Sequence, residues 1–217
     1  MRAEQCPSLS PDWEAPDGVP VDIILFGGRR RTNVPLIYQS RSWQHGCFVG
    51  ATLGGEQTAA AEGPIGVLRR DPFAMKPFTG YHMADYWRHW LEMGRQLGDK
   101  APRIFQVNWF RRGDDGRFLW PGFGDNSRVI DWIIRRISGE VTAVESPIGR
   151  LPRREDLNLE GLEITDADLD ELFDVDIDAW LAEADSTEEF YAMFGDALPP
   201  ALRSELEALR YRLNAAR

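Results

Sequence analysis

The most distinctive part of the chain is the aromatic loop, residues 109–126, which contains Trp109-Phe110 and, after a short charged turn, Phe118-Leu119-Trp120-Pro121-Gly122-Phe123-Gly124-Asp125-Asn126. Its proline and glycines exclude a regular helix or a central strand. The rings are therefore expected on a rigid loop, where they suit stacking against a flat ligand such as a nucleobase. The amide of Asn126 both donates and accepts hydrogen bonds, so it suits a polar edge of that ligand. The residues alone leave a second interpretation open, in which the rings fill a core beneath a turn.

A strand and a helix are predicted on either side of the aromatic loop. The apolar run Ile104–Phe110 is typical of a strand. The loop ends in Asp125, Asn126 and Ser127, which all favour the N-cap of a helix. A helical stripe follows, made of Val129, Ile130, Ile133, Ile134 and Ile137. The loop should thus lead directly into a helix N-terminus, whose free amides favour a polar ligand.

The rest of the chain also predicts a mixed α/β fold. Further short apolar runs indicate strands at Val21–Phe26, Pro35–Tyr38, Cys47–Ala51 and Ile65–Leu68. The apolar spacing in Met83–Leu97 predicts a helix. Beyond Pro147 the pattern changes to acidic helices, with possible capping boxes at Thr165-x-x-Asp168 and Ser186-x-x-Glu189 and a last helix after Pro199-Pro200.

Three regions are expected from these patterns. Residues 1–20 hold four prolines and should form an entering loop of a segment cut from a longer chain. Residues 21–150 form the mixed α/β region that carries the aromatic loop. Residues 151–217 form an acidic helical region that packs on the same lobe.

Charge and composition narrow the classes of partner. The net charge is −10, and it is concentrated in residues 151–217, which carry 18 acidic and 6 basic side chains. Such an acidic region repels nucleic-acid backbones, so we expect no nucleic-acid partner. The two cysteines, Cys6 and Cys47, fit a reducing cytoplasm. No apolar run approaches 18 residues and no leader is visible, so we expect neither a membrane span nor a signal peptide.

Several motifs in order resemble one known family. The aromatic loop is similar to the guanine-binding loop of GTP-dependent phosphoenolpyruvate carboxykinases. Other motifs of that family occur in the family's order: Phe26-Gly27-Gly28-Arg29-Arg30, Ser42-Trp43-Gln44-His45-Gly46, Thr58-Ala59-Ala60-Ala61-Glu62, Asp71-Pro72-Phe73-Ala74-Met75 and Pro147-Ile148-Gly149. The resemblance runs from about Pro20 to the C-terminus, more weakly after Leu162, and covers only the C-terminal third of the family's usual length. It implies the C-terminal nucleotide-binding lobe of a carboxykinase-like fold.

The resemblance also implies roles for individual residues. Phe110, Phe118 and Phe123 would enclose guanine, while Asn126 with the adjoining Gly124 and Asp125 would read its edge. Arg29 would contact phosphate, with Arg30 beside it. From the residues alone, such a cluster is normally a solvated charge cluster. The segment Gln57-Thr58-Ala59-Ala60-Ala61-Glu62 would form the active-site lid, which otherwise reads as a surface helix. A bulky residue at position 60 should then weaken lid closure and raise pyruvate formation in the assembled enzyme.

What this chain lacks is equally informative. It holds no Gly-x-x-x-x-Gly-Lys-Ser/Thr sequence, and no His/Asp set has metal-ligand spacing, so we expect no metal ligand in this segment. The resemblance places the phosphate loop, the Mn²⁺ or Mg²⁺ ligands and the oxaloacetate pocket in a missing N-terminal part. We therefore expect a GTP- and GDP-binding part of a cytoplasmic enzyme that is a monomer at full length, inactive as an isolated chain. Two alternatives stay open: a non-catalytic guanine-nucleotide-binding module, and an inert truncated product or interaction protein.

Overall fold

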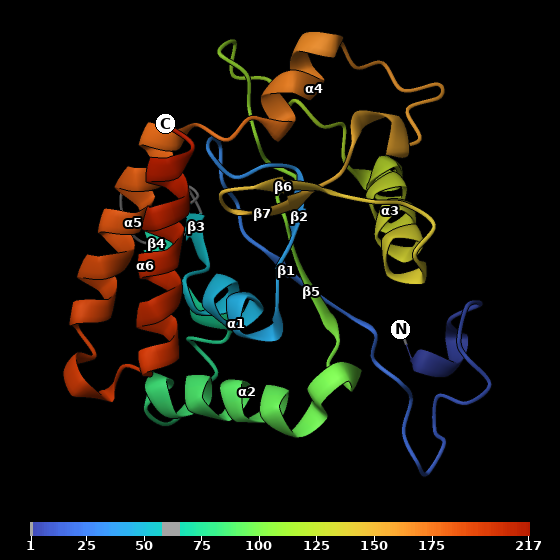
Figure 1. The fold of residues 1–217 in the computed structure, drawn as a ribbon. Coiled ribbons are helices and arrows are strands. Elements are labelled where there is room, and N and C mark those ends of the chain that lie inside the picture. Colours follow the sequence, from blue (N-terminus) through green and yellow to red (C-terminus); the bar gives the residue numbers. More distant parts are fainter. Residues whose placement is uncertain (1, 58–65) are drawn as a thin grey trace.

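The computed structural model describes residues 2–57 and 66–217, and it confirms the mixed α/β class (Figure 1). A five-stranded sheet has the order β1-β5-β2-β7-β6, and a separate hairpin pairs β3 with β4. Strand β1 is parallel to β5, while the other neighbours pair antiparallel. The strands are β1 Ile23–Gly27, β2 Ile37–Gln39, β3 Gly54–Glu56, β4 Leu68–Arg70, β5 Arg103–Val107, β6 Val144–Ser146 and β7 Gly149–Leu151.

Helices cover both faces of the sheet. Successive residues of a strand point to opposite faces, so one strand contributes side chains to the core on each side. Ile104 of β5 joins a core beneath α1, α2, α5 and α6, whereas the next residue, Phe105, joins a core beneath α3 and α4. The helices are α1 Trp43–Ala51, α2 Met83–Leu97, α3 Asn126–Ser138, α4 Asp166–Phe173, α5 Ile177–Ala192 and α6 Pro200–Ala215. Short 3-10 turns occur at Ala3–Gln5, Pro72–Ala74, Gly98–Lys100, Phe123–Asp125, Arg154–Asp156 and Gly195–Ala197.

Most predicted elements are present, and one has the wrong type. The helix Met83–Leu97 has the bounds expected from its apolar stripe. The strand expected at Cys47–Ala51 lies instead inside α1, whose N-terminus is capped by Ser42, because its hydroxyl accepts a hydrogen bond from His45 N at 3.1 Å. Nearly all of α1 is buried, so it lacks the polar face that distinguishes a helix from a buried strand.

Local signals at the acidic helices are confirmed at one position and wrong at another. Thr165 and Asp168 form the expected capping box, with two reciprocal hydrogen bonds of 3.1 Å. Ser186 does not start a helix, because it lies within α5, which begins after an N-cap at Asp176. The strand expected at Ile65–Leu68 is β4, shifted to Leu68–Arg70, and residue 65 lies outside the described residues.

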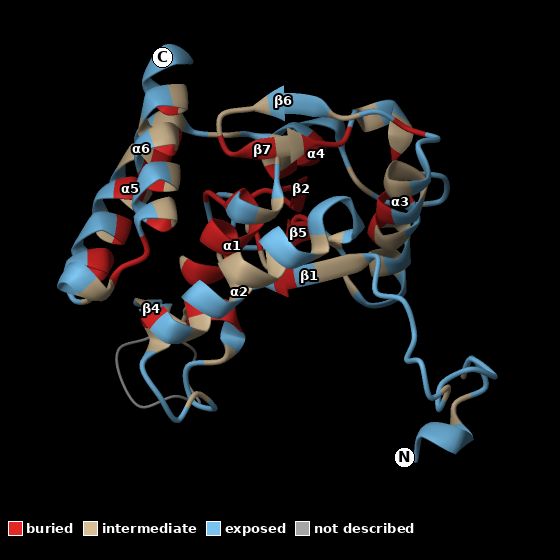
Figure 2. Ribbon diagram, turned by 60° about the horizontal axis from the view of Figure 1, so that its bottom comes forward, coloured by how far each residue is buried: buried red, intermediate tan, exposed pale blue. Residues whose placement is uncertain are grey.

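The N-terminal residues 2–22 form an arm that extends from the body and is largely exposed (Figures 1 and 2). Exposed side chains on this arm include Trp13, Val19 and Val21. None of the described helices combines the length and the apolar character that crossing a bilayer requires.

Candidate nucleotide site

The aromatic loop and the arginine segment, residues 29–31, lie beyond the carboxyl ends of two neighbouring strands, at one edge of the sheet that runs across the strand ends. The parallel strands β1 and β5 end together, with Gly27 paired to Val107. The arginine segment follows β1 and the aromatic loop follows β5. In open α/β sheets, ligands bind in crevices beyond the carboxyl ends of parallel strands. This edge is therefore the candidate site.

Two rings of the aromatic loop lie at the surface, whereas Phe110 is half-buried. Phe118 is 45% exposed and Phe123 is 96% exposed. The Phe110 and Phe118 rings meet edge to face, with centroids 6.2 Å apart. The Arg29 guanidinium carbon lies 4.2 Å from the centroid of the Phe110 ring, an attractive cation–π contact. Sequence-distant residues 29, 110 and 118 thus form one surface, and the interpretation of these rings as core plugs does not hold for Phe118 and Phe123.

The turn around Phe123 is conformationally strained. Phe123 has a φ of 52°, in the left-handed region that non-glycine residues rarely occupy. The preceding Gly122 has a φ of 78°. The Phe123 ring on this turn lies almost entirely in solvent.

Asn126, Asp125 and Gly124 lie where the loop enters α3. The Asn126 carboxamide oxygen accepts a hydrogen bond from the indole nitrogen of the buried Trp120 at 3.0 Å. The Asp125 carboxylate accepts from Arg128 Nε at 2.9 Å, so it forms an ion pair along the helix and does not cap it. The Ser127 hydroxyl donates to the Gly124 carbonyl at 2.6 Å.

Asn108, which was not among the predicted site residues, joins the two halves of the site. Its amide nitrogen donates to the carbonyls of Arg30 at 2.9 Å and Val34 at 2.8 Å. Its oxygen accepts from the backbone N–H of Phe110 at 3.2 Å and of Arg30 at 3.4 Å. The side chain is fully buried and uses all four of its hydrogen-bonding positions. Its signal in the sequence was a polar residue inside the predicted strand Ile104–Phe110, which the structure ends at Val107.

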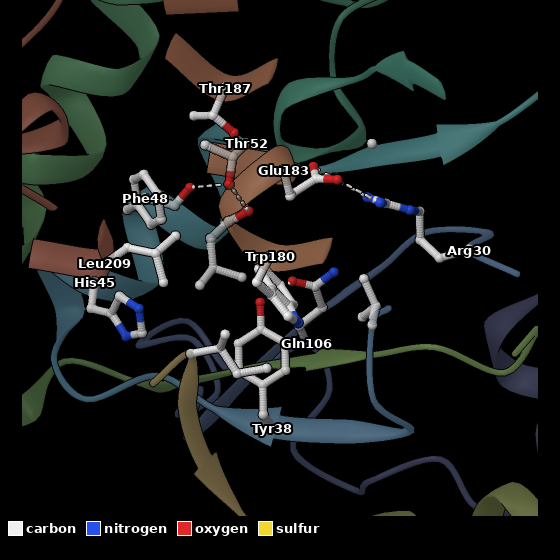
Figure 3. A pocket seen from close by; sticks show the side chains of 14 residues that line it. Arg30, Tyr38, His45, Phe48, Thr52, Gln106, Trp180, Glu183, Thr187 and Leu209 are labelled. Atoms are coloured by element: carbon white, nitrogen blue, oxygen red, sulfur yellow. Dashed lines mark hydrogen bonds and ion pairs between the residues drawn. The ribbon is translucent and has the colours of Figure 1, made fainter. Parts of the chain in front are cut away.

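Arg29 and Arg30 differ in their surroundings. Arg29 is exposed, whereas the Arg30 side chain is only 11% exposed and contacts Glu183 of α5 at 2.6 Å (Figure 3). Arg70 of β4 contacts the same carboxylate at 2.7 Å. Burial alone would raise the pKa of Glu183, but the hydrogen bonds and charges of the two arginines outweigh burial and lower it. Arg30 is therefore engaged inside the protein, and Arg29 is the arginine that faces the aromatic rings.

A small enclosed cavity of about 30 Å³ lies beside this ion pair, between the sheet and α5 (Figure 3). That volume accommodates about one water molecule. His45 lines the cavity, and burial lowers its pKa to about 3, so this histidine is neutral at physiological pH. Its Nδ1 accepts a hydrogen bond from the backbone N–H of Arg41 at 3.0 Å. These contacts suit the structural role that is usual for a lone histidine.

Comparison with known proteins gives the family. Residues 1–212 match the family model described as the phosphoenolpyruvate carboxykinase C-terminal P-loop domain. The chain belongs to this family. It is 55% identical over 212 residues to the phosphoenolpyruvate carboxykinase [GTP] of Renibacterium salmoninarum, covering 97% of this chain and 35% of that protein. The phosphoenolpyruvate carboxykinases [GTP] of Arthrobacter sp. strain FB24 and Treponema pallidum are 52% and 50% identical to this chain. These matches cover 96% and 99% of this chain, and 34% and 35% of the two carboxykinases.

The chain thus spans about a third of the length of these carboxykinases. Although the family is described as a P-loop domain, the 217 residues contain no Gly-x-x-x-x-Gly-Lys-Ser/Thr sequence. Within residues 2–57 and 66–217, no three His, Cys, Asp or Glu side chains converge as metal ligands.

The segment expected to form a lid lies mostly outside the described residues, which include Gln57 but not Thr58, Ala59, Ala60, Ala61 or Glu62. Its stem, the β3–β4 hairpin, is attached to the arginine segment. The backbone N–H of Glu56 donates to the Arg29 carbonyl at 2.8 Å. The Glu56 carboxylate accepts from the backbone N–H of Arg31 at 2.6 Å and lies 3.2 Å from Arg31 Nε. The hairpin and the arginine segment are thus held together by backbone and side-chain contacts.

Close packing explains one glycine of the Gly-Gly-Arg sequence. A Cβ atom at Gly28 would lie 2.5 Å from the Gly54 carbonyl of β3, in the β3–β4 hairpin. Any larger residue at position 28 would push the stem away from the arginine segment. The glycine requirement here comes from a tertiary contact.

Proposed function

We propose that this chain is the guanine-recognising part of a GTP-dependent phosphoenolpyruvate carboxykinase. The whole enzyme would convert oxaloacetate and GTP into phosphoenolpyruvate, CO₂ and GDP, a reaction of gluconeogenesis. The observation that carries the proposal is the surface that Phe110 and the exposed Phe118 form beside Arg29, with the exposed Phe123 on the same loop. Support also comes from relatives that are at least half identical over almost the whole chain.

The rings would stack on guanine and Asn126 would read its polar edge. Stacking is worth about 1–3 kcal/mol per base but does not distinguish bases, since every base has a π-face. Selectivity must then come from hydrogen bonds, because a mismatched base leaves polar groups unpaired. The Asn126 amide, with the adjoining Gly124 and Asp125, would supply them.

Arg29 would contact the phosphates of the nucleotide. It is exposed and held over the Phe110 ring. A guanidinium group can donate two parallel hydrogen bonds to the oxygens of one phosphate group. The Arg30 side chain, which the resemblance placed beside this contact, would act through its ion pair with Glu183.

The lid, residues 57–62, would close over the bound substrates. Decarboxylation of oxaloacetate leaves an enolate, which must take the γ-phosphoryl group before it takes a proton. Excluding water would favour phosphoenolpyruvate over pyruvate.

The remaining two-thirds of the relatives' length would supply the phosphate loop, the Mn²⁺ or Mg²⁺ ligands and the oxaloacetate pocket. Strand β1 lies at the edge of the sheet, and its Leu25 is 40% exposed. Because parallel strands are normally covered by other elements, this exposed strand supports the presence of a further part of the protein beside it. We infer a cytoplasmic enzyme that is monomeric when this further part is present.

Binding and turnover measurements test the proposal. Wild type should prefer GDP to ADP, and Asn126→Ala should reduce the ratio of their dissociation constants about tenfold, the effect of one lost hydrogen bond in a desolvated site. A control, Asn214→Ala on α6, removes an exposed amide and should leave the ratio unchanged. The chain alone should not turn over oxaloacetate, whereas mixing it with the remaining part of the enzyme should restore turnover. Preference for GDP without restored turnover would indicate a non-catalytic module, and no preference would contradict the proposal.

A further inference from the structure

The indole of Trp120 holds the Asn126 amide in one orientation. Trp120 is 1% exposed and packs in the core beneath α3 and α4. Its Nε1 lies 3.0 Å from Asn126 Oδ1. Asn126 is the first residue of α3, so its backbone is also restrained by the helix.

The direction of this hydrogen bond determines what Asn126 offers to a ligand. An indole N–H can only donate, so it must face the amide oxygen and not the amide nitrogen. The Asn126 NH₂ group then points away from Trp120. It lacks an acceptor within the part of the chain that the structure describes, and so it is available as a donor.

We propose that Trp120 sets the base selectivity of the site by presenting the Asn126 NH₂ group, and not its oxygen, to the base. This inference rests on the proposed function. A fixed NH₂ donor matches the carbonyl at position 6 of guanine or hypoxanthine. Adenine carries an amino group at that position, so two donors would face each other and remain unpaired. Without the indole N–H, the amide is free to rotate by 180° and accept from adenine.

The core provides a matched control in Trp132 of α3. Trp132 is fully buried in the same core as Trp120, but its Nε1 has no hydrogen-bond partner within the described residues. Replacing either tryptophan by phenylalanine removes the same atoms from the same core. Only the Trp120 change removes the restraint on Asn126.

The test compares the dissociation constants of GDP, IDP and ADP by isothermal titration calorimetry for wild type, Trp120→Phe and Trp132→Phe. In Trp120→Phe, the preferences for GDP over ADP and for IDP over ADP should both fall about tenfold, as expected for one donor–acceptor mismatch. In Trp132→Phe, both ratios should stay at the wild-type values. IDP lacks the 2-amino group of GDP, so equal changes in the two ratios assign the effect to position 6.

A second variant separates loss of the N–H from loss of packing. Replacing Trp120 by its benzothienyl analogue preserves the ring shape and substitutes sulfur for the N–H, so it should give the same fall in selectivity even if Trp120→Phe does not fold. Unchanged ratios in this variant, with wild type still preferring GDP, would overturn the inference and leave the proposed function standing. A wild-type chain without preference for GDP over ADP would overturn the proposed function and this inference together.

Discussion

Asn108 illustrates how much of the site depends on one buried side chain. Its four hydrogen bonds connect Arg30 and Val34, which follow β1, with Phe110, which follows β5. A buried amide that is fully paired stabilises the fold modestly, but removing it leaves several backbone groups unpaired. Asn108 therefore sets the separation of the arginine segment and the aromatic loop.

Asn108→Ala should lower the free energy of unfolding by about 1–3 kcal/mol, because the Arg30 and Phe110 backbone groups lose their partners. Urea denaturation followed by circular dichroism measures this change. The nucleotide dissociation constant should rise as well, since the two halves of the site are no longer tied. The control Asn214→Ala removes an exposed amide with one bond, to the Arg210 carbonyl, and should change stability by less than about 0.5 kcal/mol. A stable Asn108→Ala protein with unchanged GDP affinity would contradict this role.

Helix α1 shows how an element can depend on tertiary packing. Its sequence contains Gly46 and Gly50, which are poor helix formers. A Cβ atom at Gly46 would lie 2.4 Å from Ile104 Cδ1 of β5, and one at Gly50 would lie 2.9 Å from the Phe26 ring of β1. The glycines thus allow the helix to approach the sheet closely, which favours them over better helix formers.

Gly46→Ala should destabilise the protein by about 1–3 kcal/mol, because the added methyl overpacks the contact with Ile104. Intrinsic helix propensity predicts the opposite sign, a gain of about 1 kcal/mol. The free energy of unfolding in urea decides between the two. Gly80→Ala is the control, since a Cβ atom at Gly80 meets nothing within 4 Å. A more stable Gly46→Ala variant would show that the helix–sheet contact relaxes easily.

Across the whole molecule, the Glu183 carboxylate ties three distant segments together. It contacts Arg30 beyond β1 at 2.6 Å and Arg70 of β4 at 2.7 Å, and it belongs to α5. All three side chains are at most 13% exposed. Removing one partner of such a buried cluster leaves an uncompensated buried charge. The resulting loss in the free energy of unfolding is larger than the stabilisation that the ion pair itself provides.

Glu183→Gln should lower the free energy of unfolding at pH 7 by on the order of 3 kcal/mol, because two buried arginines lose their counter-charge. In this variant, the free energy of unfolding should also fall less steeply as the pH is lowered. The folded-state pKa of Glu183 lies below its ordinary value of 4.5, so its contribution is fully present above pH 4.5 and is lost as the pH falls through the folded-state pKa. Urea denaturation between pH 7 and pH 3 measures both effects.

Glu188→Gln is the matched control for this experiment. Glu188 lies on the same helix and pairs with Arg210 at 2.7 Å, but it is 69% exposed. Exposed ion pairs contribute about 0–1 kcal/mol, so the change in stability should be small. If Glu188→Gln destabilised the protein as much as Glu183→Gln, the buried cluster would have no special role.

Features set by neighbouring residues could be predicted from the sequence. The apolar stripe of Met83–Leu97 is sufficient to place α2, and the Thr165–Asp168 spacing is sufficient to place the start of α4. The proline and glycines after Trp120 likewise exclude an α-helix or a central strand in the aromatic loop. Each of these results follows from backbone geometry or from contacts within one turn of chain.

Features set by residues far apart in the chain required the tertiary structure. The identity of α1 depends on the closeness of Gly46 to Ile104, and the difference between Arg29 and Arg30 depends on Glu183, more than 150 positions away. Asn108 and Trp120 acquire their roles only once β1 and β5 pair and the loop folds back to α3. Local sequence patterns determine torsion angles and side-chain periodicity. The long-range contacts depend instead on which buried polar groups the folded chain brings together, because each buried polar group needs a hydrogen-bond partner.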